Sequence, residues 1–546
     1  MKLALEALPT TLDDTYTQML LGIEPMYHQQ AVTLLQWLAY ARSPLTLGEL
    51  VEAAIIDPIE ESRIDVENRG SIEDTLNILA GLVATQESQA PDDQGSLKTE
   101  PSMADVSNAE SGCTNITQYR RFWSSKTTVR LAHFSVKEYL ESKRMLKGDA
   151  NHFHLGSAVG HRILAQSCLT YLRHYCASSD KTLTEQDLAL FPLVEYAAQS
   201  WYYHATLQSD GEVNREVSFL LSDGAREAWL HVHDPDSFWK EPSKTLVHES
   251  SPALYYASLL GLGAVVKNLL DRGADINAQG GENANALQAA SLGGHKEVVQ
   301  LLLDNDADVN AQGGRYGNAL RNASIEGHQE VVQLLLEKGA DANAQDRDYG
   351  NALEAASFKG FESIVRLLLD EGAIIDAAGV RRGSLPSACI GGHIGLVRLL
   401  LDEGACINAQ GNNFGNALQA ASLGGHAELV QFLLDKGANV HDQGGHYGNA
   451  LQAAASEGFS EIVQLLLDNG AKANAPSRNQ TSALQAASFR GYPKIVQLLL
   501  DNDADVNAQG GRYGTALQAA SAEGHKEVVQ LLQAAGAQDL SVNIDC

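Results

Sequence analysis

Aromatic side chains recur at a fixed place in the second half of this chain, each four residues before the leucine of a nearly constant phrase, NALQAAS-x-x-GH. Arginines stand near several of them. Aromatic residues and arginine contribute much of the binding energy at protein interfaces, so this spacing predicts a row of contacts for a partner protein. The members of the row are Tyr316, Tyr349, Phe414, Tyr447, Tyr513, Arg315, Arg347, Arg381, Arg382 and Arg512.

Two residues just before the glycine of the same phrase change strongly in size and charge from one copy to the next, while their surroundings stay constant. Exposed positions that vary on a constant frame are suited to binding, because they can change without disturbing the fold. The pairs with the largest side chains are predicted to contact a partner. They are Ile325, Glu326, Phe358, Lys359, Phe489 and Arg490.

A second interpretation of the aromatic row stays open. The tyrosines could stack on neighbouring loops and only stiffen the structure, in which case they would contribute to stability and not to binding. The sequence does not decide between the two interpretations.

Histidines also recur, once in most copies of the phrase, and could suggest metal ligation. Copies that lie roughly 10 Å apart cannot place two histidines on one zinc ion, whose ligand distances are near 2 Å. We therefore expect these histidines to begin helices of the scaffold, and no metal to bind. They are His295, His328, His393, His426 and His525.

Catalytic motifs are missing from the sequence. There is no H-E-x-x-H, no G-x-S-x-G, no cysteine-nucleophile signature and no phosphate-binding G-x-x-x-x-G-K-[ST]. His133 and Ser135 stand two residues apart where a strand meets a helix, and a structural role is the better interpretation. We predict a protein that is not an enzyme and that uses no cofactor and no small-molecule substrate.

The charge of the chain limits its partners. It has 39 Lys and Arg against 68 Asp and Glu, a formal net charge of -29. Such a chain is repelled by nucleic-acid phosphates and by anionic membranes, so we expect no direct contact with either. Six cysteines without a C-x-x-C pair fit a reducing compartment, and the N-terminus does not resemble a signal peptide. The expected location is the cytoplasm, the nucleus or both.

The elements that must position these side chains follow from the repeat. Its leucine stands at 254, 287, 320, 353, 385, 418, 451, 484 and 517, a spacing of 33 residues with a single step of 32. In the copy over 318–343, Asn318 is a good N-cap and Gly327 a good helix end. His328 then begins a second, more apolar helix. A fixed period of this length predicts a stack of helix pairs.

Units such as GHKEVVQLLLDNDADVNAQGG at 294–314 resemble the ankyrin repeat. The resemblance covers 252–538 and implies nine repeats, a mostly α-helical solenoid, and partners held at loop tips and first-helix ends. The family's Thr-Pro-Leu-His is here close to Asn-Ala-Leu-Gln. Its histidine ties adjacent repeats together, so that bond must come from the glutamine in its place or be lost. The glutamines are Gln288, Gln419, Gln452, Gln485 and Gln518.

The fifth repeat is irregular. It is one residue shorter than the others and carries Pro386 just after its leucine. A proline beyond the first turn removes a helical hydrogen bond, so we expect a kink or weaker stacking here.

The first 250 residues have another composition and contain all five tryptophans. Helical patterns are followed by strand-like segments at 81–85 and 128–134, which predicts a winged-helix-like module over 1–145 with a disordered insertion at 88–118. A helical connector is expected over 146–249, and a tail over 539–546. The phrases LPTTLDDTYTQMLLGI, SPLTLGELVEAAII and VRLAHFSVKEYLES resemble the region that follows the nucleotide-binding domain in fungal NLR-like proteins, a domain that this chain lacks.

These patterns favour a regulatory adaptor that binds another protein through its repeats. Two alternatives stay open. One is a nuclear transcription coregulator that holds a transcription factor. The other is the sensor half of an NLR-like system whose nucleotide-binding subunit is a separate chain.

Overall fold

The computed structural model is mostly helical, as the sequence predicts, and divides into two compact units, Met1–Asp275 and Ile276–Cys546. It describes residues 10–57, 64, 76–87, 127–182, 184, 186–208, 212–236, 251–345, 350–375, 383–411, 414–475, 481–510 and 514–538. The insertion predicted at 88–118 and the tail predicted at 539–546 lie outside these residues.

The N-terminal unit begins with helices around a small antiparallel sheet of three strands in the order β1-β3-β2. Leu45 of β1 and Val83 of β2 pair with Val129 and Leu131 of β3. The strands expected on either side of the insertion therefore pair with each other. The elements are α1 (Thr10–Leu21), η2 (Pro25–Tyr27), α2 (His28–Tyr40), β1 (Leu45–Thr46), α3 (Leu47–Ala54), β2 (Val83–Glu87), β3 (Thr127–Leu131) and α6 (Phe134–Leu140).

Helices then form the rest of this unit, around an aromatic core. Trp201 and Trp229 are fully buried, with ring centroids 5.6 Å apart, and Phe219 lies 5.6 Å from Trp201. The elements are η5 (Met145–Lys147), η6 (Asn151–Phe153), α7 (Ser157–Ala177), α8 (Asp187–Leu190), α9 (Val194–Leu207), α10 (Asn214–Leu221), α11 (Asp223–Val232), α12 (Ala253–Leu259) and α13 (Gly263–Asp271).

A buried polar cluster joins α7 and α9. His161 Nδ1 lies 2.9 Å from His204 Nδ1, and His204 Nε2 lies 2.9 Å from the hydroxyl of Tyr196. The backbone N–H of Arg42 donates to the same hydroxyl. Burial lowers the pKa of His204 to about 3, and His161 and Arg42 add to this effect. His204 is therefore neutral at physiological pH.

The first helix pair of the predicted repeats, α12 and α13, packs with the N-terminal unit. The ring of Tyr256 on α12 lies 5.7 Å from that of Trp229, edge to face. The hydroxyl of Tyr255 donates to Asp236 Oδ1 at 2.7 Å. The division between the units thus falls after this pair, between Asp275 and Ile276.

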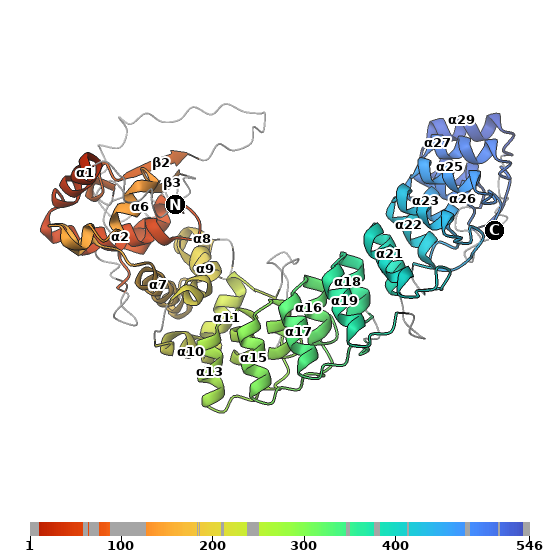
Figure 1. Ribbon diagram of the computed structural model, residues 1–546. Helices are drawn as coiled ribbons and strands as arrows, with labels where there is room; N and C mark the ends of the chain where they lie inside the picture. Colours follow the sequence, from red (N-terminus) through yellow and green to blue (C-terminus); the bar gives the residue numbers. More distant parts are fainter. Residues whose placement is uncertain are drawn as a thin grey trace, which may run out of the picture. The chain divides into compact units, whose positions relative to one another are not determined.

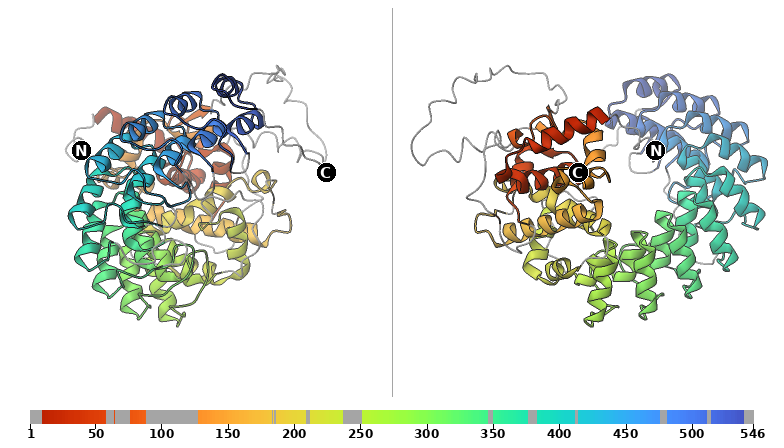
Figure 2. Two further views of the ribbon diagram at one scale, coloured as in Figure 1. Left: turned by 90° about the vertical axis from the view of Figure 1, so that its right-hand side faces the viewer. Right: turned by 60° about the vertical axis from the view of Figure 1, so that its left-hand side comes forward.

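The second unit is a row of helix pairs that lie side by side (Figures 1 and 2). First helices are rich in alanine and serine, which lets neighbours approach closely, and second helices bury valine and leucine. The pairs are α14 (Ala286–Leu292) with α15 (Lys296–Asp304), α16 (Ala319–Glu326) with α17 (Gln329–Glu337), α18 (Ala352–Lys359) with α19 (Glu362–Asp370), α20 (Ser384–Ile390) with α21 (Ile394–Asp402), α22 (Ala417–Gly424) with α23 (Ala427–Asp435), α24 (Ala450–Glu457) with α25 (Ser460–Asp468), α26 (Ala483–Arg490) with α27 (Pro493–Asp501), and α28 (Ala516–Ala522) with α29 (Lys526–Ala534).

The fifth repeat departs from the others, though not through a bent helix. Pro386 is the third residue of α20, within the first turn, where a backbone N–H has no helical partner in any case. The expected kink in this helix is therefore wrong. Helix α20 packs closely on α18 and α22, while α21 approaches α19 and α23 less closely than second helices approach each other in the later repeats. The expected weaker stacking is found, but between the second helices.

The described residues include no helix of the length and apolar character that crossing a bilayer would require.

Candidate protein-binding groove

The seven first helices from α14 to α26 each end near a glycine that the next repeat covers with an aromatic or imidazole ring. Gly327 has φ +83°, and a Cβ placed on it would lie 2.7 Å from the ring of Phe361. At Gly458, with φ +90°, the ring of Tyr492 would be 2.8 Å away. Both the left-handed backbone and the lack of space require glycine at these positions. The residues that vary must therefore stand before this glycine and not at it.

The repeat histidines are part of this ladder of rings. His328 precedes α17, and its Nε2 donates to the carbonyl of Leu292 in the preceding repeat, at 2.9 Å. His393, His426 and His525 make the equivalent bond to the first helix before them. The bonds support the structural role that the sequence predicts for these histidines. In the described part of the chain, no three His, Cys, Asp or Glu side chains are grouped so that they could hold a metal ion.

Glutamine replaces the family's histidine as the tie between adjacent loops. Gln288 Nε2 donates to the carbonyls of Ala311, Gly313 and Gly317 in the next repeat, at 3.0–3.2 Å. Gln419, Gln452 and Gln485 reach the following loop in the same way. The prediction that glutamine supplies this bond is confirmed for these four residues.

The variable pairs before the glycines lie at the free ends of the first helices. Glu326, Phe358, Lys359 and Arg490 are exposed, and Ile325 and Phe489 are half-buried. Phe358 keeps 37% of its surface accessible, which is unusual for such a large apolar side chain on an otherwise polar face. The four exposed residues are accessible to a partner. Their role in binding stays a prediction.

The aromatic loop residues are held more firmly than the variable pairs. Tyr316 is half-buried between two guanidinium groups, those of Arg315 and Arg321, at 5.4 and 5.7 Å from its ring centroid. Arg315 also bonds Glu282 in the preceding loop through its backbone N–H, and its side chain forms an ion pair with Glu282 at 3.6 Å. The side chains of Tyr316 and Arg315 thus make several contacts within the array itself.

Tyr447 and Phe414 are half-buried as well. The hydroxyl of Tyr447 donates to Glu457 Oε1, at the end of its own first helix, at 3.1 Å. Burial raises the pKa of Tyr447, and the carboxylate of Glu457 raises it further, so the phenol stays protonated and continues to donate. Tyr447 therefore fixes the position of a variable residue.

Six residues of the predicted row lie outside the residues that the structure describes. They are Tyr349, Tyr513, Arg347, Arg381, Arg382 and Arg512.

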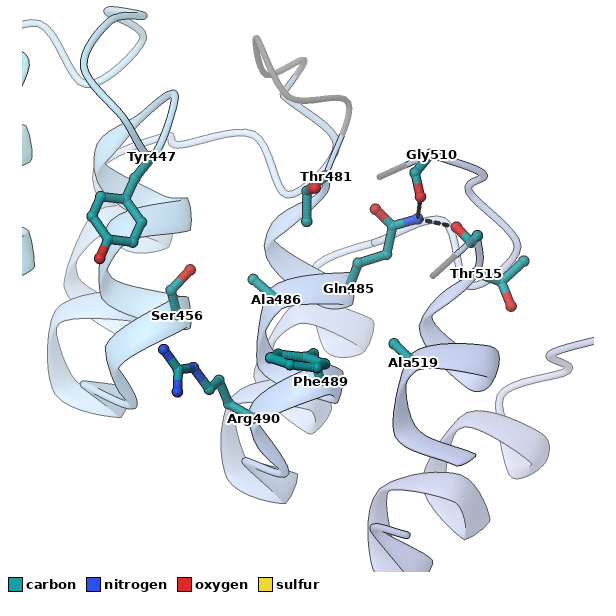
Figure 3. A pocket seen from close by; sticks show the side chains of 11 residues that line it. Tyr447, Ser456, Thr481, Gln485, Ala486, Phe489, Arg490, Gly510, Thr515 and Ala519 are labelled. Atoms are coloured by element: carbon teal, nitrogen blue, oxygen red, sulfur yellow. Dashed lines mark hydrogen bonds between the residues drawn. The ribbon is translucent and has the colours of Figure 1, made fainter. Parts of the chain in front are cut away.

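A groove of about 240 Å³ opens over the first helices α24, α26 and α28, and it brings together three of the predicted contact residues. Tyr447 and Ser456 stand on one side and Phe489 and Arg490 on the next helix (Figure 3). Phe489 lies beside the small side chain of Ala519, while the guanidinium of Arg490 extends toward Ser456. The groove exists because alanine, serine and glycine leave room between successive helices.

The charge of this groove is mixed. Arg490 is exposed and has no ion-pair partner among the described residues; its guanidinium carbon lies 6.0 Å from the ring centroid of Phe489. Glu457 lies one repeat before it, bonded to Tyr447. A ligand side chain on the ring would thus have a cation and a carboxylate nearby. Such a pair can orient a ligand more than it strengthens binding.

The sequence did not single out the small residues that shape the groove. Thr481, Ala486, Thr515 and Ala519 line it with Gln485, which was predicted only as a tie between repeats. The available signal was the alanine that stands two residues after six of the nine recurring leucines, Ala486 and Ala519 among them, since a small residue there leaves the first-helix face open.

His133 and Ser135 cap a helix instead of forming a reactive pair. His133 precedes α6, and its Nδ1 accepts from the backbone N–H of Ser135. Ser135 Oγ lies 2.6 Å from the same nitrogen and 2.8 Å from the hydroxyl of Tyr16, and Ser135 is buried. A buried hydroxyl in these contacts has the structural role expected for it.

The family model for ankyrin repeats matches five overlapping segments, 254–346, 318–379, 353–444, 418–510 and 451–544. Together they span more than half of the 546 residues. The chain belongs to the ankyrin-repeat family. The matches begin at residue 254, so the likeness of the first 245 residues to NLR-like proteins stays a hypothesis.

A curated relative adds one finding. The chain is 35% identical over 303 residues to the azaphilone pigments biosynthesis cluster protein L of Monascus ruber. The alignment covers 52% of this chain and 56% of the relative, so the chain spans about half the length of the protein that it matches.

Proposed function

We propose that this chain is a non-enzymatic adaptor that holds a partner protein in the groove over α24, α26 and α28. The proposal rests on one observation: within each repeat, the residues that bond neighbouring repeats differ from the residues that vary. Constant residues such as Gln485 and His525 make the bonds between repeats, while Phe489 and Arg490 belong to a pair that varies and keep part of their surface accessible at the end of α26. Accessible side chains that vary on a constant frame are available for recognition.

The size of the groove supports a protein partner over a small-molecule substrate. Small-molecule sites are commonly enclosed cavities of roughly 300–1,000 Å³. The groove is smaller, about 240 Å³, and lies along a row of parallel helix ends. It can take one or two side chains of a longer segment, as protein interfaces require.

The experiment compares three single variants of the full chain as baits in quantitative affinity capture from the native host. Phe489→Ala and Arg490→Glu change the groove. Lys494→Glu is the matched control, because it makes the same charge change in the same repeat but on the exposed start of α27. A partner held in the groove is lost with both groove variants and retained with the control. Circular dichroism must show that all three variants stay folded.

Equal capture of every protein by wild type, Phe489→Ala and Arg490→Glu would contradict the assignment of the groove. Tyr447→Phe separates the two interpretations of the aromatic row. If the tyrosine only positions Glu457, its loss lowers thermal stability slightly and leaves capture unchanged.

A transcription coregulator is the second candidate, and the relative is the starting point for it. That protein belongs to a pigment biosynthesis cluster. We propose on this basis that the partner of this chain is a regulator of biosynthetic genes, and that the array binds this protein without contacting DNA. Imaging of the tagged protein and transcript levels after deletion test it. Strict exclusion from the nucleus would refute it.

A further inference from the structure

The groove residues belong to a set that occurs twice in the array. Each member of the second set stands 131 residues after its counterpart in the first, a distance of four repeats. We call them the first subsite, Tyr316, Glu326, Phe358 and Lys359, and the second subsite, Tyr447, Glu457, Phe489 and Arg490. Elsewhere the first-helix ends between them carry Ile390-Gly391 and Leu423-Gly424, which offer no charge.

The two subsites have the same residue types at the same positions of successive first helices. In each, a half-buried tyrosine precedes a first helix that ends in glutamate, and the next first helix ends in phenylalanine followed by a cation. Lys359 and Arg490 are both exposed, and neither has an ion-pair partner within the described ranges. The same four side-chain groups, a phenol, a carboxylate, a phenyl ring and a cation, thus occur twice along one row of helices.

This order of charges favours a peptide segment with a basic, an apolar and an acidic side chain in that order. An apolar side chain can pack on the phenylalanine, where the partly exposed ring gains from leaving water. A carboxylate next to it in the ligand would meet Lys359 or Arg490. A lysine or arginine on its other side would meet Glu326 or Glu457 of the preceding repeat. Exposed ion pairs add little affinity, but they set direction and exclude segments with the opposite order of charges.

The spacing favours a partner that presents this segment twice. Packed helices lie about 8–10 Å apart, so four repeats separate the subsites by roughly 40 Å along the row. One short segment on an open groove binds weakly, whereas two segments on one partner convert the second binding event into an intramolecular one. A partner that carries the segment twice along its own chain meets this requirement, because both copies can then run in the same direction along the row.

We infer that the array has two related subsites, four repeats apart, that hold two copies of one basic–apolar–acidic segment carried in tandem by one partner chain. The inference rests on the proposed adaptor function and deepens it. The subsites differ in their surroundings: Ile325 and Arg321 in the first stand where Ser456 and Gln452 stand in the second. The groove of about 240 Å³ lies at the second subsite, which we therefore expect to bind the more tightly of the two.

The test uses synthetic peptides with a Lys-Gly-Leu-Asp core. One peptide carries the core once, and a tandem peptide carries it twice, joined by about 50 Gly/Ser residues, whose average span is near 40 Å. Binding of each fluorescent peptide to the full-length chain is measured by anisotropy at low salt. The tandem peptide is expected to bind at least about tenfold more tightly than the single one.

Three variants locate the effect. Lys359→Glu and Arg490→Glu should each reduce tandem binding to the level of the single peptide, and Lys494→Glu should leave the gain intact. A tandem peptide with Asp replaced by Lys and Lys by Asp should lose binding to the wild type. The chains must show the same helical signal by circular dichroism.

The inference is overturned if the tandem peptide binds no better than the single one, if Lys359→Glu leaves the gain unchanged, or if the tandem peptide shows no binding at about 1 mM, the limit of weak association. Capture of the native partner separates this failure from that of the proposed function. Loss of capture with Arg490→Glu and not with Lys359→Glu refutes two subsites but retains the adaptor. Capture that depends on neither refutes both.

Discussion

The N-terminal unit and the repeat array provide hydrogen-bond partners for their buried polar groups in different ways. The first unit buries individual groups in local networks, such as His161 with His204, and Glu52 with the hydroxyl of Tyr171. In the array a few bonds are made over and over, from glutamine to the next loop and from histidine to the preceding helix. The comparison shows where variation is tolerated. In the array, exposed residues outside the repeated bonds can change without disturbing the contacts between repeats, whereas each network of the N-terminal unit depends on its own residues.

The largest effect in this comparison is expected at a helix-ending glycine. Gly458→Ala places a Cβ 2.8 Å from the ring of Tyr492 and forces alanine into a left-handed backbone. The two costs together should destabilise the array by about 3 kcal/mol. Gly437→Ala is the matched control, since its φ is +87° but a Cβ there meets nothing within 4 Å. It should cost about 1 kcal/mol. Urea unfolding followed by circular dichroism measures both, and equal losses would show that the ring contact is unimportant.

Acid should weaken the N-terminal unit and spare the array. The fold lowers the pKa of His204 from 6.5 to about 3. Between pH 6.5 and 3, His204 is protonated in the unfolded chain but neutral in the folded chain. The free energy of unfolding therefore decreases as pH falls below 6.5. At pH 5 the loss is about 2 kcal/mol.

All five tryptophans precede residue 240, so tryptophan fluorescence reports unfolding of this unit selectively. Urea midpoints at pH 7.5 and 5 should differ for the wild type. The difference should shrink in His204→Gln, whose amide does not titrate. An unchanged pH dependence in that variant would assign the effect to another group.

The hydrogen bond from the repeated glutamine should be lost when its donating amide is replaced by a carboxylate. Gln485→Glu places a carboxylate oxygen, which can only accept, opposite the carbonyls of Ala508, Gly510 and Gly514. The change should lower the free energy of unfolding by about 1.5 kcal/mol. Glu354→Gln is the matched exchange in the fourth repeat. There Glu354 Oε1 accepts from the backbone N–H of Gly383, and an amide oxygen can accept the same bond. The change in its free energy of unfolding should stay within about 0.5 kcal/mol.

The smallest effect is expected on the outer surface of the array. Lys296 and Lys338 form ion pairs with Glu330 and Asp304 of neighbouring repeats, at 2.9 and 2.7 Å. Exposed pairs of this kind contribute little. Lys296→Ala should leave the urea midpoint of the array unchanged within error, in low and in high salt. A clear shift would show that outer ion pairs help to hold the repeats together.

Sequence reasoning worked best where a local rule decides the structure. Asn318 accepts from the backbone N–H of Arg321 as an N-cap, and Thr46 and Glu49 form the capping box that their spacing indicates. Each of these contacts spans three residues, so its geometry is fixed by the helix alone. The expectation of a kink at Pro386 was wrong, because this proline is the third residue of α20 and lies within the first turn.

The sequence by itself determined the period, the helix pairs, the membership of the ankyrin-repeat family and the positions that vary. These follow from local spacing and from the apolar pattern of each helix. Only the tertiary structure decided that Tyr316 and Tyr447 are held by their own repeats, that rings of the next repeat cover the helix-ending glycines, and that small residues leave a groove beside Phe489. Those features depend on which side chains neighbouring repeats bring into contact, and residues 33 apart meet only when the repeats stack.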